Sequence, residues 1–530
     1  MANKLELTWV GKDEPIRIEP RLLIEHPELS NIEKDRETQN MLIHGDNLLA
    51  LKALENKYVG QVKCIYIDPP YNTGSAFENY DDNLEHSQWL NLMRSRLEIL
   101  WKLLSEDGSL WISIDDDEQA YMKVLCDELF GRSSFIASII WQKRTSPDMR
   151  AVISDGHEYI LVYAKNKELF KQSRNRLPLS EEQRRSYKNP DNDPRGPWTS
   201  TDCTAQAGHG TAEQFYTLTT PAGRVIELPR SLCWRFTKER MEEEITAGRI
   251  WLGKDGKGVP RKKTYLKDSK GVVPWTLWMN KEVGHNQEAK KEINVLFGSN
   301  NTFDTPKPER LIERIIHIAS NPGDLILDSF LGSGTTAAVA QKMGRRWIGI
   351  EMGNHAYTHC KVRMDKVILG EDEGGITKSQ NWQGGGGYRF YELAPTLIKE
   401  DAFGERVINA EYDADMLAAA VALHEGFTYE PDSKLFWKQS IGSENSYLFV
   451  TTRHLNSTFL DSIKGTMEDG EYLIVACRSY DSGLDKAYEN ITVKKIPQML
   501  FDRCEFGKTD YNLNIVHPPM YEDDKEDCNE

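Results

Sequence analysis

This chain lacks closely spaced cysteine pairs. Its eight cysteines are scattered over 530 residues, and no two of them form a C-x-x-C pair. Scattered cysteines are typical of reduced thiols, and they do not supply the ligand spacing of a structural zinc site. We therefore expect reduced cysteines and no metal site.

Long apolar runs are also missing. No stretch approaches the roughly 18 continuous apolar residues that a membrane-spanning helix requires. Residues 1–5 include no basic segment followed by an apolar core, which argues against a signal peptide. With 39% hydrophobic and 28% charged residues, the composition is that of a chain that buries a sizeable core in several domains. We expect a cytoplasmic protein without a membrane partner.

Basic residues are fewer than acidic ones, which gives a formal net charge of -16, but the two kinds are unevenly distributed along the chain. Residues 141–300 hold 28 Lys and Arg against 20 Asp and Glu, whereas the rest of the chain holds 38 against 62. Tryptophans are interleaved with the basic clusters of this segment, a combination that suits a phosphate backbone and flat bases. A solvated surface over a tryptophan-containing core would give the same composition. The residues concerned are Lys171, Arg174, Arg176, Arg184, Arg185, Lys188, Arg261, Lys262, Lys263, Lys267 and Lys270, with Trp198, Trp234, Trp251, Trp275 and Trp278.

The tetrapeptide Asp68-Pro69-Pro70-Tyr71 follows the apolar run 64–67, so we expect a carboxylate at the end of a buried strand. Proline fixes φ and lacks a backbone donor, which holds the carbonyls of Asp68 and Pro69 in one geometry. With the ring of Tyr71, these acceptors suit a planar base that carries an exocyclic amine. We take all four residues as candidate catalytic residues; a strand that ends in a rigid turn is the simpler alternative.

A second motif covers residues 322–336 and predicts a turn, a buried strand, a glycine-rich turn and the start of a helix. The glycines allow a ligand to approach the backbone closely. A further strand, 347–350, ends in an acid whose distance from the glycines suits hydrogen bonds to ribose hydroxyls. The candidate binding residues here are Asp328, Phe330, Gly332, Ser333, Gly334, Thr335 and Glu351.

Together, the two motifs resemble those of the amino-group DNA methyltransferases that use S-adenosylmethionine, in the permuted (beta-group) order in which the catalytic tetrapeptide comes first. In that family, Asp-Pro-Pro-Tyr goes mainly with methylation of adenine N6. Residues 41–47 resemble the segment that reaches the cofactor adenine, and residues 305–310 resemble the opening of the cofactor half. Residues 191–198 and the length beyond the cofactor half look most like the modification subunits of type III restriction systems.

This resemblance implies a site-specific DNA methyltransferase that moves a methyl group from S-adenosylmethionine to N6 of a flipped adenine in double-stranded DNA, for restriction-modification. Asp68 and the Pro69 carbonyl would hold the amine, and Tyr71 would stack on the base. The partners we expect are double-stranded DNA and a second copy of the chain, as a homodimer; a restriction (helicase-nuclease) subunit is a further possibility. The resemblance adds three cofactor-binding residues: Asp46, Asn47 and Lys307.

Other functions fit less of the sequence. An NAD-dependent oxidoreductase could use residues 332–334 as a dinucleotide turn, but it leaves the tetrapeptide and the basic segment without roles. A phosphate-loop ATPase would need Lys where Thr335 stands. A DNA-binding specificity module without catalysis is disfavoured because both motifs are intact. The acidic run 115–117 suits a helix N-terminus better than a metal, and His157 is expected to be structural.

The fold class we predict is α/β, with a doubly wound Rossmann-like methyltransferase sheet, an inserted DNA-recognition domain and an additional C-terminal α+β domain. Residues 48–54 predict a helix, residues 87–104 predict a helix capped by Ser87, and the runs 447–452 and 471–477 predict strands. The expected domains are an N-terminal arm (1–40), a catalytic half (41–170), a target-recognition insert (171–300), a cofactor-binding half (301–382), a Gly-rich linker (383–390) and a C-terminal domain with an acidic tail (391–530).

Overall fold

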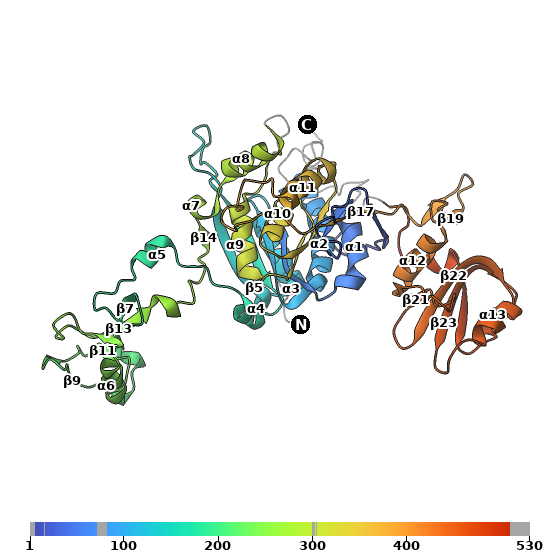
Figure 1. Ribbon diagram of the computed structural model, residues 1–530. Helices are drawn as coiled ribbons and strands as arrows, with labels where there is room; N and C mark the ends of the chain where they lie inside the picture. Colours follow the sequence, from blue (N-terminus) through green and yellow to red (C-terminus); the bar gives the residue numbers. More distant parts are fainter. Residues whose placement is uncertain (1–5, 15, 72–81, 299–302, 304, 509–530) are drawn as a thin grey trace, which may run out of the picture. The chain divides into compact units, whose positions relative to one another are not determined.

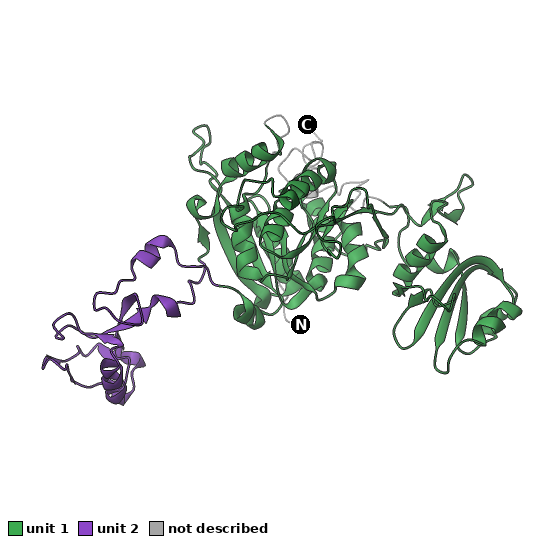
Figure 2. Ribbon diagram, in the orientation of Figure 1, with its two compact units in different colours: residues 1–175, 275–530 green, residues 176–274 purple. Residues whose placement is uncertain are grey.

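The structure is a computed structural model that describes residues 6–14, 16–71, 82–298, 303 and 305–508. Two compact units share the chain: residues 1–175 with 275–530, and residues 176–274 (Figure 2). Within the described ranges, every helix is too short or too polar to cross a membrane. The unit boundaries fall inside the expected insert, so its residues 171–175 and those from 275 onward belong to the first unit.

A ten-stranded, mostly parallel sheet organises the first unit (Figure 1). The six strands β17, β2, β16, β15, β3 and β4, which are neighbours in that order, are all parallel. On one side of them, β6 is antiparallel to both β4 and β5, and β14 is parallel to β5. On the other side, β1 is antiparallel to β17. In sheet order the strands are β1 (Leu23–Glu25), β17 (Arg389–Leu393), β2 (Met41–His44), β16 (Arg346–Glu351), β15 (Leu325–Asp328), β3 (Val62–Ile67), β4 (Leu104–Ile114), β6 (His157–Ala164), β5 (Phe135–Gln142) and β14 (Leu277–Trp278).

The central strands are apolar on both sides because helices cover both faces of the sheet. All residues of β3 and β15 are buried, as is usual for parallel strands between helical layers. Ile65 and Ile67 pack in the core that α1, α2 and α3 share, and α9 also contacts β3. The helices are α1 (Asn47–Tyr58), α2 (Asp82–Leu103), α3 (Gln119–Phe130), α4 (Lys167–Ser173), α7 (Asn280–Val283), α8 (Asn286–Phe297), α9 (Glu309–Ala319), α10 (Thr335–Lys342), a π-helix (Ala356–Lys361) and α11 (Val362–Leu369).

Local patterns predicted several of these elements. The helix expected at 48–54 is α1, and the strands expected at 64–67 and 347–350 are β3 and β16. The cap expected at Ser87 is wrong, because α2 begins five residues earlier and Ser87 lies inside the helix. Trp89, Met93 and Leu97 of α2 are buried, as the helical spacing indicates.

The strand β17 crosses the boundary that we expected between the linker and the C-terminal domain. Its residues pair in parallel with β2, from Arg389 beside Met41 to Glu392 beside His44. Residues 389–393 are therefore part of the main sheet. The glycines that precede β17 allow a close backbone approach, since a Cβ at Gly387 would lie 2.6 Å from the carbonyl oxygen of Asn31.

The second unit, residues 176–274, is built from short strands and has its own small core. That core gathers Cys203, Leu218, Trp234, Met241 and Ile250. Its strands and helices are β7 (Trp198–Asp202), β13 (Arg261–Tyr265) and β12 (Ile250–Trp251) in one sheet, the pairs β8 (Thr204–Gln206) with β11 (Leu232–Trp234) and β9 (Leu218–Thr219) with β10 (Val225–Ile226), and the helices α5 (Glu181–Arg185) and α6 (Lys238–Thr246).

Several aromatic and basic residues that we expected on a DNA-facing surface are buried. Trp198, Trp234 and Trp278 are at most 5% exposed, so for these three the alternative of a tryptophan-containing core is correct. Lys263 is buried as well and forms ion pairs with Asp191 and Asp193. The Arg195 guanidinium and Lys263 hold the pKa of the Asp193 carboxyl well below its usual range. Trp275, by contrast, is 80% exposed.

The C-terminal part carries a separate five-stranded sheet in the order β20-β21-β22-β23-β24. The two strands that we expected at 447–452 and 471–477 are β22 and β23, which pair in parallel. The expected acidic tail lies outside the described residues. The elements are β18 (Ile398–Glu400), β19 (Arg406–Ile408), α12 (Ala414–Glu425), β20 (Thr428–Tyr429), β21 (Ser440–Ile441), β22 (Ser446–Leu455), α13 (Ser457–Lys464), β23 (Tyr472–Tyr480) and β24 (Ile491–Lys495).

Candidate active site

The two sequence motifs meet at the carboxyl edge of the main sheet. β3 and β15 are parallel neighbours, so Asp68, which follows β3, and Asp328, which ends β15, lie at the same edge. Along the chain, β3 is followed by β4 on one side and β15 is followed by β16 on the other. Such a change of direction opens a crevice between the two strands, and ligands of open α/β sheets bind there.

A cavity of about 540 Å³ lies at this point. Of the predicted site residues, Asp46, Asn47, Gly334 and Glu351 do not line it. The predicted site residues that do line it are Asp68, Pro69, Pro70, Tyr71, Lys307, Asp328, Phe330, Gly332, Ser333 and Thr335.

The Asp68 carboxylate is held by two donors from different parts of the chain. The Tyr71 hydroxyl donates to Oδ1 at 2.6 Å, and Lys307 Nζ donates to Oδ2 at 2.7 Å. Trp89 of α2 donates to the Pro70 carbonyl at 2.7 Å and so fixes the turn after β3. Each carboxylate oxygen has a second lone pair, so Asp68 can accept a further hydrogen bond while both donors stay in place.

Burial and charge compete at this carboxylate. Burial raises the pKa of Asp68 above its ordinary value; the positive charge of Lys307 opposes this change, and the negative charge of Glu158 adds to it. Burial alone would lower the pKa of Lys307, but the charges of Asp68 and Glu158 outweigh it and raise that pKa. Lys307 therefore remains a cation.

Glu158 and Lys143 belong to the same cluster, although we did not select them from the sequence. Glu158 Oε2 lies 3.1 Å from the Tyr71 hydroxyl and 3.5 Å from Lys307 Nζ, and Oε1 lies 3.5 Å from Lys143 Nζ. Both residues are buried and line the cavity. In the sequence, Glu158 stands out only as a charged residue near the start of the largely apolar strand β6. Its place near β3 follows from the pairing of β6 with β4 and of β4 with β3.

The glycine-rich turn is held by the acid at the end of β16. Glu351 Oε2 accepts the backbone N–H of Gly332 at 2.7 Å, and Oε1 accepts that of Gly353 at 3.0 Å. Gly332 and Gly334 have φ of +56° and +81°, which favours glycine at both positions. A Cβ at Gly334 would meet the Cα of Cys360 at 3.3 Å, so this glycine is needed for packing against the π-helix.

Asp328 is a buried acid at the end of β15. Its Oδ1 accepts the N–H of Phe330 at 2.9 Å, and its Oδ2 accepts the Thr336 hydroxyl at 2.6 Å. Burial raises the pKa of Asp328 to about 7. The side chain therefore fixes the start of the turn that leads to α10.

Asp46 and Asn47 follow β2, two strands away from β15. Asp46 Oδ1 caps α1 by accepting the N–H of Leu48 at 2.9 Å, and its Oδ2 pairs with Arg96. Asn47 donates to the carbonyl of Ser329 at 2.8 Å. Asn47 thus links the end of β2 to the residue after β15, whereas Asp46 fixes the start of α1 and pairs with α2.

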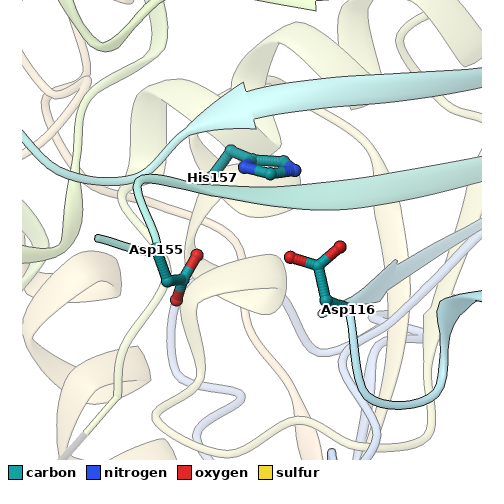
Figure 3. A group of neighbouring side chains, drawn as sticks. All are labelled: Asp116, Asp155 and His157. Carbon is teal, nitrogen blue, oxygen red and sulfur yellow. The ribbon is translucent and has the colours of Figure 1, made fainter. Parts of the chain in front are cut away.

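One group of possible metal ligands lies near the start of β6. Asp116, Asp155 and His157 bring one ligand atom each to within 4.8 Å of one another (Figure 3). Lys143 Nζ lies 2.6 Å from Asp155, however, and already supplies a positive charge. The ring of His157 packs edge-on against Tyr159, with centroids 4.9 Å apart. The acidic groups are exposed and need no ion at this position.

Comparison with known proteins gives consistent matches for this region. The family model described as DNA methylase matches residues 62–361. The Mod subunit of the type III restriction-modification enzyme StyLTI from Salmonella typhimurium is 37% identical over 399 residues, which cover 68% of this chain and 59% of that protein. The EcoPI Mod subunit of Escherichia phage P1 is 30% identical over 90% of this chain and 78% of its own length.

The chain does not span all of these relatives. Matched residues cover only 54% of the HindVI Mod subunit from Haemophilus influenzae, at 32% identity. Among solved structures, the DNA modification methylase TTHA0409 from Thermus thermophilus, complexed with S-adenosyl-L-methionine, matches 61% of this chain and 94% of its own at 19% identity, with a TM-score of 0.33. The cytosine-N4-specific PvuII DNA methyltransferase matches 62% of this chain and 86% of its own at 15% identity, with a TM-score of 0.34.

Proposed function

Because this chain belongs to the DNA methylase family, we propose that it transfers a methyl group from S-adenosylmethionine to N6 of an adenine flipped out of double-stranded DNA. The observation that carries this proposal is the meeting of Asp68 and the glycine-rich turn in one cavity at the carboxyl edge of the sheet. We also propose that this sheet is a doubly wound, Rossmann-like methyltransferase sheet.

The acceptor half of the proposed site consists of Asp68, the Pro69 carbonyl and Tyr71. An ionised Asp68 accepts a hydrogen bond from the adenine amine, which increases the electron density on the nitrogen, and it is the group positioned to take the proton that the amine loses. The ring of Tyr71 provides a stacking surface for the base. An aspartate at the first position of the tetrapeptide favours adenine N6 over cytosine N4, by the resemblance already described.

The residues of the glycine-rich turn fit the cofactor. The cavity volume, about 540 Å³, is in the usual range for small-molecule sites of about 300 to 1,000 Å³. A side chain at Gly332 would crowd the ring of Phe303, because a Cβ there would lie 3.2 Å from it. The nearby carboxylates of Asp328 and Glu158 suit a cationic ligand. When bound, S-adenosylmethionine supplies a methyl group activated by its sulfonium centre.

The roles of the other parts follow from the family and remain proposals. We propose that residues 176–274 recognise the target sequence in DNA, that Asp46, Asn47, Lys307 and Glu351 support the cofactor half, and that the chain acts in the cytoplasm as a homodimer. The Salmonella and phage relatives are named as Mod subunits of type III restriction-modification enzymes. We therefore propose a restriction subunit as a partner, and copurification with the product of a neighbouring helicase-nuclease gene would test it.

A methyl-transfer assay tests the central proposal. The protein is incubated with radiolabelled S-adenosylmethionine and unmethylated genomic DNA, and the modified bases are identified by sequencing. We expect N6-methyladenine at one short recognition sequence. Methylated cytosine, or no transfer to DNA, would contradict the proposal.

The first prediction separates the two halves of the site. Asp68→Ala should abolish methyl transfer and leave the heat of S-adenosylmethionine binding nearly unchanged, because Asp68 is assigned to the target amine. Asp116→Ala, which changes an exposed acid outside the cavity, serves as the control. A loss of cofactor affinity as large as the loss of rate would refute the assignment.

A further inference from the structure

The loop between β5 and β6, residues 143–156, exposes three apolar side chains that the site does not use. Met149 and Ile153 are each 89% exposed, and Val152 is 103% exposed. The loop extends beyond the ends of β5 and β6 as a narrow hairpin (Figure 1). Large apolar side chains gathered at the tip of a loop are costly in water and mark a surface that meets a partner.

Hydrogen bonds hold the tip of the loop, residues 149–153, in a defined turn. The Asp148 N–H donates to the Ser154 hydroxyl at 2.7 Å across the loop, and the Asp148 side chain accepts the N–H of Arg150 at 3.0 Å. At the base of the loop, the Lys143 N–H donates to the Gly156 carbonyl at 3.0 Å and extends the β5–β6 ladder. Residues 149–153 are thus held outward by bonds at both ends of the turn.

The base of the loop adjoins the active-site cavity. A second cavity, of about 390 Å³, is lined by residues 143–148 of the loop and by parts of α8 and residues 305–306. It shares Lys143, Arg144, Asn286, Thr305 and Pro306 with the cavity that holds Asp68. The base of the loop therefore lies beside the cavity to which, under the proposed function, DNA delivers the target base.

The chemistry of the tip suits a base stack better than a protein. A stable protein interface buries about 800 Å² on each partner, much more than three neighbouring side chains provide. A step between two base pairs, by contrast, accepts one or two apolar side chains as a wedge. Arg144 is exposed on the same loop and brings positive charge toward neighbouring phosphates, whereas the charge of Arg150 is paired with Asp148.

We propose that Met149, Val152 and Ile153 form an apolar wedge that enters the DNA base stack beside the target adenine and occupies part of the space that the extruded base leaves. This inference rests on the proposed function. Extrusion of a base costs stacking and pairing energy. Apolar contact between the wedge and the exposed neighbouring bases offsets part of that cost and prolongs the extruded state.

The test uses the triple variant Met149→Ser, Val152→Ser, Ile153→Ser and a short duplex that contains the methylated sequence. We expect the methylation rate on the paired duplex to fall roughly tenfold or more, and the fluorescence rise of 2-aminopurine at the target position to shrink with it. On a duplex in which the target adenine faces an abasic site, the variant should stay within roughly twofold of the unaltered protein, because extrusion there costs less.

The control is Phe403→Ser, which removes a 90% exposed apolar side chain from the turn between β18 and β19. It should methylate both duplexes at the unaltered rate. Normal activity of the triple variant on the paired duplex would overturn the wedge, and so would an equal loss on both duplexes, which would indicate damage to chemistry or folding. Absence of methyl transfer by the unaltered protein would overturn the proposed function and the wedge together.

Discussion

At the scale of single residues, Lys307 and Glu158 act on Asp68 in opposite directions. The proposed role of Asp68 is to accept the amine in its ionised form, so the methylation rate should rise as pH rises through the pKa of Asp68. Lys307 lowers that pKa and Glu158 raises it. In Lys307→Met the acidic limb of the pH profile should therefore move to higher pH, and in Glu158→Gln it should move to lower pH.

The measurement is the single-turnover rate of methylation as a function of pH, for both variants and the unaltered protein. Glu98→Gln removes an exposed carboxylate from α2 and should leave the profile unchanged. Shifts of the two site variants in the same direction would show that Asp68 is not the titrating group.

Tyr71 combines two functions that substitution can separate. Its hydroxyl donates to Asp68, and its ring is the proposed stacking surface. Tyr71→Ala should cost ~1 to 3 kcal/mol of DNA binding, the usual value of one base stacked on an aromatic ring. Tyr71→Phe should keep most of that energy because stacking needs the ring and not the hydroxyl. The DNA affinity of each variant is measured by fluorescence titration with duplexes that carry 2-aminopurine at the target position, either paired or mismatched. Equal affinity of Tyr71→Ala and the unaltered protein would mean that Tyr71 is only a turn residue.

At the scale of elements, a buried charge network joins α9, α10 and α11 below the glycine-rich turn. Lys342 of α10 pairs with Glu309 at 2.8 Å and with Asp372 at 2.6 Å, and Arg363 of α11 pairs with Glu309 at 2.8 Å. All four side chains are at most 2% exposed. The network therefore fixes the helices that carry the turn.

Removing one member of this network leaves a buried charge without its partner. Lys342→Met should lower the free energy of unfolding by about 3 to 5 kcal/mol. Lys361→Met is the matched control. Lys361 pairs with Asp365, one helical turn further along the chain, and both side chains are about a quarter exposed. Loss of this exposed ion pair should lower the free energy of unfolding by about 1 kcal/mol or less. Denaturant unfolding followed by circular dichroism compares the two, and similar losses would contradict a special role of the network.

The sequence predicted elements whose signal is local and missed arrangements that depend on partners far along the chain. Buried parallel strands such as β3 and β16 are apolar on both sides, so their residues identify them without a partner. The position of β17 in the main sheet depends on pairing with β2, more than 300 residues earlier. Nor does residue type indicate that Trp234 is buried in the insert or that Glu158 lies against Tyr71, because both follow from packing between elements.

At the scale of the whole molecule, residues 176–274 provide a matched pair of lysines for testing DNA contact. Lys262 is exposed, whereas the next residue, Lys263, is buried against Asp191 and Asp193. Lys262→Gln should weaken binding to all DNA sequences alike and reduce the slope of log affinity against log salt by about 1, as loss of one phosphate contact does. Lys263→Gln should instead lower the melting temperature.

Affinity measured at several salt concentrations, together with thermal unfolding, distinguishes these outcomes. A salt slope that does not change in Lys262→Gln would remove this lysine from the DNA-binding surface. A stable Lys263→Gln variant would mean that the buried ion pairs do not hold the second unit together.

The strand order of the main sheet has a consequence for how the protein is made. β2 and β3 leave the ribosome early, but they are not neighbours, because β16 and β15 lie between them. A nascent chain that ends before residue 325 contains Asp68 and Tyr71 but lacks the two strands that join the halves of the sheet. The centre of the sheet is thus completed late in translation, and only then do the acceptor residues and the glycine-rich turn form one pocket. Partial products of translation therefore carry the tetrapeptide without a complete site.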